Sequence, residues 1–320
     1  MKTNSIVPQT PKFETLFTQD SGSHVFSLVV ITRDDPRIHE CIESARHYAL
    51  GTELVIVLDE SPIDYVSQVK DSLQQWPSSS SVKIVRTIEH VCKGELRNLG
   101  AVTSKGSYLI FIDSDCTFDA AYIPYLQQAQ AKNSVPFRTG KMLFNPKEPV
   151  TWFSRLNCNH CYEEHETLSS YIRTPNICVE RETFFKTGGF PAVWHGEDFA
   201  FHQRCLLRGY STTYDPDLVM FHQDDLRWQK TVWMWTSYGR GRAFRLKLEG
   251  AIFGRPVPLG LAFKQGKIQT KTFASKMFHL AYRIVTDAAC LYGLLWYWRK
   301  TDFAQIARET VPGETVPDSI

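Results

Sequence analysis

The chain has 320 residues, of which 43% are hydrophobic and 22% charged, enough to bury a large core in one domain or one domain with an appendage. A net charge of only +2 at pH 7 argues against a nucleic-acid-binding protein, which would carry a strongly basic surface. No run of 18 apolar residues is present, so no membrane-spanning helix is expected.

The first 24 residues are polar and lack the apolar core of a secretion signal. They are expected to form a flexible segment of a cytoplasmic protein. Eight cysteines are scattered along the chain, several within apolar runs, as reduced thiols commonly are. Cys158 and Cys161 flank His160, but no second ligand pair follows at zinc spacing. Packing on a helix face is therefore favoured over zinc binding.

Apolar runs alternate with helical patterns in the first half of the chain. Strands are expected at residues 25–31, 54–58, 82–85 and 108–112, and helices at residues 38–50, 62–76 and 95–104. Near-continuous apolar strands that alternate with helices predict a mostly parallel, Rossmann-like α/β sheet covered on both faces. No G-x-G-x-x-G turn follows the first strand, so a dinucleotide site is not expected.

The order of elements changes in the second half of the chain. Extended segments are expected at residues 135–144, 174–179 and 218–221, and helices at residues 150–167, 181–187 and 197–207. Two long helices follow at residues 226–248 and 272–300, separated by a Gly- and Pro-rich loop over residues 250–266.

The fourth apolar run, Tyr108 to Ile112, ends abruptly in Asp113-Ser114-Asp115. Side chains two residues apart in an extended chain lie on the same face, so both carboxylates can point beyond the strand's carboxyl end. A hard cation such as Mg²⁺ or Mn²⁺, with diphosphate oxygens completing its shell, suits such a pair. A second Asp-x-Asp, Asp215-Pro216-Asp217, follows no apolar run and is expected in a loop with solvated acids.

Five motifs in this order resemble glycosyltransferase family 2, the inverting sugar transferases with a GT-A fold. The resemblance runs from about Phe26 to His222. It rests on the strand from Glu53 to Asp59 with Ser61, on Gly94-Glu95-Leu96-Arg97-Asn98-Leu99-Gly100, on Asp113-Ser114-Asp115, on Gly188-Gly189-Phe190 with Gly196-Glu197-Asp198, and on His222. One departure is Leu58-Asp59-Glu60, where the family usually has two aspartates and a glycine.

The resemblance implies a metal-dependent transfer of one sugar from a nucleotide-sugar donor, taken to be a UDP-sugar. Asp115 and His222 are implied as metal ligands, with Asp113 as a further ligand that also touches the ribose. Asp198 is implied as the general base and Glu197 as the residue that orients the acceptor. The nucleotide-sugar site is expected to comprise Thr32, Arg33, Asp34, Asp59, Lys93, Arg97 and Asp113. For Arg97, a surface helix charge is an equal alternative, and for residues 32–34 an ordinary turn.

The same resemblance implies a domain organisation and a set of partners. A GT-A domain is expected over residues 25–225, with a nucleotide-binding half (25–118) and an acceptor half (119–225). A helical extension (226–302) and a polar tail (303–320) follow. The acceptor is expected to be a glycan, a lipid-linked sugar or a small molecule.

Aromatic and basic residues are interleaved in the helical extension, for example Trp233, Trp235, Arg240 and Arg242. Such a helix can rest on the cytoplasmic face of a membrane, or its aromatic residues can form a core while its basic face is solvated. Two rival functions remain open. A nucleotidyltransferase would be expected to carry a Gly-rich phosphate loop after the first strand, which residues 32–36 do not supply. A non-catalytic nucleotide-sugar-binding or scaffold protein would not need both Asp115 and Asp198.

Overall fold

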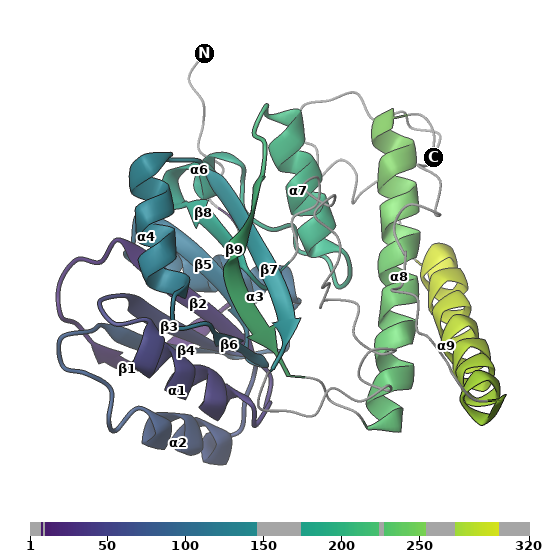
Figure 1. Cartoon of the computed structure of the whole chain (residues 1–320), viewed down its shortest axis with the longest axis horizontal. Helices are drawn as coiled ribbons and strands as arrows, with labels where there is room; N and C mark the ends of the chain where they lie inside the picture. The colour runs from purple at the N-terminus through teal and green to yellow at the C-terminus, as the bar shows by residue number, and fades with distance from the viewer. Residues whose placement is uncertain (1–7, 9, 146–173, 224–226, 254–272, 301–320) are drawn as a thin grey trace. The chain divides into compact units, whose positions relative to one another are not determined.

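The computed structural model describes residues 8, 10–145, 174–223, 227–253 and 273–300 (Figure 1). The chain divides into two compact units. The first comprises residues 1–148 and 160–223, and the second residues 149–159 and 224–320. The helix expected at residues 150–167, the Cys158–Cys161 pair and most of the loop expected at residues 250–266 lie outside the described residues.

Within the described residues, the first unit is built on a nine-stranded sheet in the order β1-β4-β3-β2-β5-β8-β7-β9-β6. The strands are β1 (Phe13–Gln19), β2 (Phe26–Thr32), β3 (Glu53–Leu58), β4 (Val82–Thr87), β5 (Tyr108–Asp113), β6 (Cys116–Phe118), β7 (Phe137–Phe144), β8 (Ile177–Glu180) and β9 (Thr213–His222). Strands β4, β3, β2 and β5 are parallel, which confirms the predicted parallel core. Beyond β5 the sheet is mixed, because β8 is antiparallel to both β5 and β7.

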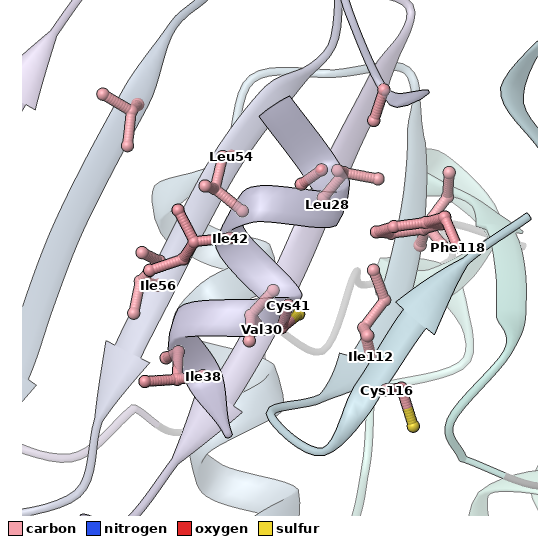
Figure 2. Packing of buried hydrophobic residues seen from close by; sticks show 14 of the residues in the cluster. Leu28, Val30, Ile38, Cys41, Ile42, Leu54, Ile56, Ile112, Cys116 and Phe118 are labelled. Carbon is pink, nitrogen blue, oxygen red and sulfur yellow. The ribbon is translucent and has the colours of Figure 1, made fainter. Parts of the chain in front are cut away.

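Helices cover both faces of this sheet. They are α1 (Ile38–Tyr48), α2 (Ile63–Ser72), α3 (Lys93–Thr103), α4 (Tyr122–Lys132), α6 (Arg181–Lys186) and α7 (Glu197–Leu207). Alternate strand residues face opposite sides. Leu28 and Val30 of β2 belong to the core cluster formed with α1, α2 and α4 (Figure 2). Val55 and Val57 of β3 pack with α3 on the other side. Burial on both faces explains why these strands are apolar at most positions.

The N-terminal segment departs from the sequence prediction. The expectation of a flexible segment over residues 1–24 is wrong for β1, which pairs antiparallel with β4 from Phe13 opposite Thr87 to Gln19 opposite Val82. Most of the side chains of β1 are exposed, so its sequence carries no apolar signal. Backbone pairing with β4, which β1 covers as the edge strand of the sheet, forms it instead. Helix α4 and strand β6 were also not expected from the sequence.

The second Asp-x-Asp motif is not a solvated loop. It lies within β9, and the Asp215 side chain is buried, with Arg138 Nη1 2.7 Å from Asp215 Oδ2. The hydroxyl of Tyr125 donates to Asp215 Oδ1 at 2.7 Å. Asp217 is exposed, as expected. The prediction of a solvated acid is therefore wrong for Asp215, because β7 and α4 bring partners that the local sequence does not contain.

Replacing Asp215 by Asn is expected to lower the free energy of unfolding by about 3–5 kcal/mol, because the charge of Arg138 would remain buried without its counter-ion. The matched control Asp217→Asn, at an exposed position two residues away, should change it by less than about 0.5 kcal/mol. Urea denaturation followed by circular dichroism measures both. Equal midpoints for the two variants would show that the buried pair does not stabilise the fold.

A buried histidine in α7 predicts a specific pH dependence of stability. His202 is 1% exposed, and burial lowers its pKa from 6.5 to about 4. Since the unfolded chain takes up this proton near pH 6.5 and the folded chain only near pH 4, stability is lost as the pH falls through that interval. The contribution is up to about 3 kcal/mol. His202→Gln should therefore lose less stability than the wild type between pH 7 and pH 4. The control His47→Gln, at an exposed position, should lose stability with falling pH as the wild type does. If the stability of His202→Gln also fell in parallel with that of the wild type, the prediction would be wrong.

The second unit contains two long helices, α8 (Trp228–Phe253) and α9 (Phe273–Lys300). Trp235 Nε1 donates to the hydroxyl of Tyr282 at 3.1 Å. A Cβ on Gly239 would lie 1.8 Å from the carbonyl oxygen of Cys290, and one on Gly293 would lie 2.0 Å from that of Thr236. Only glycine at these two positions allows so close an approach of α8 and α9.

Helix α8 extends further than the sequence predicts. Residues 250–253, predicted to begin a loop, instead continue α8. In the part of the chain that the structure describes, neither α8 nor α9 nor any other helix combines the length and apolar character needed to cross a membrane.

Candidate functional site

The carboxyl ends of the parallel strands bring predicted site residues together. Thr32 ends β2, Asp59 follows β3 and Asp113 ends β5. The register places Thr32 beside Leu58 and Ile31 beside Asp113. The backbone N–H of Asp59 donates to the carbonyl of Thr32 at 3.0 Å. Open α/β sheets bind their ligands at this edge.

A buried arginine connects the strand end to α7. Arg97 of α3 is 1% exposed; its Nη2 donates to Asp113 Oδ1 at 2.8 Å and its Nη1 to Glu197 Oε1 at 2.7 Å. Lys93 Nζ lies 3.7 Å from the other oxygen of Asp113. Burial by itself raises the pKa of Asp113, but the charges of Lys93 and Arg97 lower it by more than burial raises it. The net pKa is below the usual value, so this carboxyl stays ionised. Two predicted motifs on opposite sides of the site thus share one guanidinium.

This geometry changes the role expected for Arg97. The sequence places it among the residues that bind the nucleotide sugar, or on the helix surface. Its buried guanidinium is instead held by two carboxylates, which leaves no surface for a phosphate or a base. Arg97 therefore fixes the position of Glu197 relative to Asp113. The sequence alone does not predict this bridge, because Arg97 and Glu197 are 100 residues apart.

Replacing Arg97 by Met is expected to lower the free energy of unfolding by about 3–5 kcal/mol, because Asp113 and Glu197 would remain close together without their shared cation. Arg97→Lys keeps one charge and should cost less, although a single ammonium cannot reproduce the guanidinium fork. Thermal denaturation of the two variants and the wild type measures the order of their stabilities. If Met and Lys were equally tolerated, the bridge would not hold the site together.

Asp115, two residues beyond Asp113, also lies among cations. His222 Nε2 is 3.5 Å and Arg37 Nη2 is 3.4 Å from Asp115 Oδ2. Pairing of β6 with β9 places Cys116 opposite His222 and so brings the histidine beside the aspartate. Burial alone raises the pKa of Asp115, but His222, Arg37 and Lys93 outweigh it and hold the pKa well below its usual range. Arg37 belongs to none of the five motifs, and its only sequence signal is its place shortly after the first strand.

Two of the three predicted metal ligands, Asp115 and His222, lie close enough together to share a divalent cation. Over the described residues, no group of three or more His, Cys, Asp or Glu side chains is placed to hold a metal ion. The predicted set of Asp113, Asp115 and His222 is not formed, because Asp113 faces Arg97 and Lys93. Asp115 and His222 bring an oxygen and a nitrogen to within 3.5 Å of each other. The carboxylate suits Mn²⁺ or Mg²⁺, and either ion can draw further ligands from water and phosphate, whereas the imidazole favours Mn²⁺ of the two.

The predicted nucleotide-binding residues divide by exposure. Arg33, Asp34 and Lys93 are exposed, whereas Thr32 and Asp59 are buried. The Thr32 hydroxyl lies 3.1 Å from the hydroxyl of Tyr65. Direct contact of the Thr32 and Asp59 side chains with a nucleotide is therefore not supported. They hold neighbouring groups instead.

Asp59 holds a histidine that the motif search missed. His90 Nδ1 lies 2.5 Å from Asp59 Oδ2, and His90 Nε2 lies 2.8 Å from Arg33 Nη1. Since a guanidinium can only donate, Nε2 accepts and Nδ1 carries the proton donated to Asp59. The His90 ring also contacts the half-exposed ring of Trp194, with the centroids 4.9 Å apart. The available sequence signal was that His90 closely follows β4, which ends at the same edge of the sheet.

The acid pair lies in the first turn of α7. Glu197 is buried and tied to Arg97, whereas Asp198 is half-buried. Asp198 Oδ1 accepts a hydrogen bond from the backbone N–H of Phe199 at 2.7 Å. The positive end of the helix dipole favours the ionised carboxylate here. Of the two acids, Asp198 is therefore the more accessible to an acceptor.

Asn98 explains why two of the motifs occur together. Its carboxamide donates to the carbonyl of Phe190 at 2.8 Å and accepts from the Phe190 N–H at 2.9 Å. The Arg-Asn pair of α3 thus fixes both the segment that leads into α7 and, through Arg97, the first acid of that helix.

Three comparisons with known proteins bear on this site. The model of the family described as glycosyl transferase family 2 matches residues 27–190. A mannosyltransferase from Pyrobaculum calidifontis, solved with GDP-Man and Mn²⁺, is 16% identical, with 90% of this chain and 79% of that chain covered and a TM-score of 0.55. TarS from S. aureus (residues 1–349), solved with UDP-GlcNAc, is 13% identical, with 86% and 89% covered and a TM-score of 0.53. No curated protein sequence matches significantly.

The two solved structures share the fold with this chain, and the family model covers half of its length, including the Gly94–Gly100 and Asp113–Asp115 motifs. The predicted GT-A fold is therefore confirmed. The chain belongs to glycosyltransferase family 2.

Proposed function

We propose that the protein is a metal-dependent inverting glycosyltransferase. It transfers a single sugar from a nucleotide-sugar donor to a hydroxyl of a glycan, a lipid-linked sugar or a small molecule. The observation that supports this most is the Arg97 bridge, which sets the strand end with Asp113 beside the acid pair of α7. A donor side and an acceptor side are thereby held within one rigid cluster.

The donor half of the proposed reaction rests on Asp115, His222 and Lys93. Bound Mn²⁺ or Mg²⁺ supplies positive charge that neutralises the diphosphate as it departs. Asp115 and His222 would hold that ion, and the exposed ammonium of Lys93 would contact a phosphate oxygen. Arg37 keeps Asp115 ionised in the absence of the ion.

The acceptor half rests on Asp198 and Glu197. Asp198 accepts the proton of the attacking hydroxyl, while Glu197, fixed by Arg97, orients the acceptor. Attack from the face opposite the departing diphosphate, in a single displacement, inverts the anomeric carbon. No covalent sugar intermediate is needed.

The donor nucleotide is proposed to be UDP, and its base is proposed to lie against Arg33 and His90. Asp59 would act indirectly, by orienting His90. The solved relatives were crystallised with GDP-Man and with UDP-GlcNAc, so both nucleotides belong in the test. A role in polysaccharide biosynthesis follows if the acceptor is a glycan.

Further proposals concern the organisation and location of the chain. Residues 25–225 are proposed as the catalytic domain and residues 226–302 as a helical extension. A cytoplasmic location is supported by the six cysteines in the described residues, which are all buried and form no disulfide with one another.

The decisive experiment measures nucleotide release from a panel of UDP-, GDP- and other nucleotide sugars, with and without Mn²⁺ or Mg²⁺. Slow hydrolysis of one donor that a chelator abolishes is the expected result. A non-catalytic binding protein would show a thermal shift with the nucleotide diphosphate but no release. If no nucleotide were released from any donor and none changed the melting temperature, the proposed function would be wrong.

A further inference from the structure

The second unit is far more basic than the rest of the chain. Helices α8 and α9 together contain nine Lys and Arg residues and two Asp and Glu residues, a surplus of seven cations. Because the whole chain has a net charge of +2, all other residues together carry a surplus of five acids. Such an asymmetry points to an anionic partner for the two helices.

Helix α9 exposes an apolar stripe along its length. Met277, Ile284, Leu291 and Trp298 follow one another at seven-residue intervals, so they lie on one helix face. Their exposed fractions are 49%, 61%, 55% and 43%, and Leu295, on the same face, is 48% exposed.

The other side of α9 accounts for its packing within the unit. Tyr282, Thr286, Cys290 and Tyr297 are buried and recur at helical spacing. Tyr282 contacts Trp235 of α8. The two stripes lie on opposite sides of α9, so the exposed one, apart from Trp298 at its end, is not needed to hold α9 against α8.

Cations and aromatic rings border the exposed stripe. Arg240 lies over the ring of Trp296 at 4.6 Å and Lys247 over that of Trp298 at 4.5 Å. Arg299 is exposed beside Trp298, and Tyr292 is 61% exposed. Asp287, the single acid of α9, is also exposed; it lies three residues after Ile284 and four before Leu291, on the same face as the stripe, where it offsets one of the positive charges. Aromatic rings and basic side chains around an apolar face suit the headgroup region of a bilayer.

We propose that α9 lies flat on an anionic lipid surface, with the stripe of Met277, Ile284, Leu291, Leu295 and Trp298 entering the acyl boundary. The neighbouring Lys and Arg side chains would contact lipid phosphates. No described helix can span a membrane, which is consistent with an interfacial helix rather than an inserted one. This inference is independent of the catalytic roles proposed above, because it uses no residue of the first unit.

The test is co-sedimentation of the full chain with vesicles of phosphatidylcholine, with and without phosphatidylglycerol. The wild type should bind the vesicles that contain phosphatidylglycerol, and salt should weaken the binding. The double variant Ile284→Asn/Leu291→Asn should bind roughly tenfold more weakly, because two inserted apolar side chains are lost. Ile63→Asn is the matched control, since Ile63 is 63% exposed on α2 of the first unit, and it should bind as the wild type does.

Three results would overturn the proposal. One is that the wild type does not co-sediment with vesicles of either composition. Another is equal binding by the double variant and Ile63→Asn. The third is a wild-type dimer, seen by light scattering, that the double variant dissociates, because the stripe would then be covered by a second copy of the chain. Circular dichroism melting of each variant verifies that its fold is retained.

Discussion

Asp198→Asn is expected to lower the rate of sugar transfer by about 10²- to 10⁴-fold, the range that a positioned general base contributes. The amide keeps the size of the side chain and can still accept from the N–H of Phe199, but it cannot take a proton from the acceptor. Donor binding should change little, because Asp115, His222 and Lys93 are untouched. Transfer is measured with the donor identified by nucleotide release, and binding by the thermal shift with the nucleotide diphosphate.

The chain offers a matched control for this substitution. Asp64 is the second residue of α2, as Asp198 is the second residue of α7, and it is exposed. Asp64→Asn removes the same charge from the same helix position and should leave transfer unchanged. A normal transfer rate in Asp198→Asn would show that another group accepts the proton.

Asp115→Asn is expected to lower transfer by about 10²- to 10³-fold, the cost of losing one electrostatic partner of the developing charge. It should also remove the thermal stabilisation produced by UDP with Mn²⁺, because His222 alone provides a single ligand. This second effect separates Asp115 from Asp198, whose variant should keep the metal-dependent shift.

Asp217→Asn is the control for Asp115→Asn, since Asp217 ends the other Asp-x-Asp motif and is exposed. It should keep both transfer and the thermal shift. The assignment of Asp115 as a metal ligand is wrong if Asp115→Asn responds to UDP and Mn²⁺ as fully as Asp217→Asn does.

Local sequence was enough to predict most of the parallel core. The apolar runs that became β2, β3 and β5 are buried on both faces, and burial of this kind leaves a nearly continuous signal along the chain. In β4 the signal is shorter, because Lys83 and Arg86 are only partly buried. The same signal distinguished Asp113-Ser114-Asp115 from Asp215-Pro216-Asp217, because only the first follows such a run. Strand β1 could not be predicted this way, since it is held by backbone pairing while its side chains remain mostly exposed.

The sequence by itself therefore determined the fold class, the family resemblance and the strand ends at which the polar residues gather. Only the tertiary structure decided what each polar side chain does there. It buried Arg97 between Asp113 and Glu197, placed Lys93 beside Asp113, set His90 against Asp59 and paired Asp215 with Arg138. The physical reason is the distance in sequence between the interacting residues. Periodicity records which face of an element is buried, whereas an ion pair depends on partners up to 100 residues away, and no local pattern encodes them.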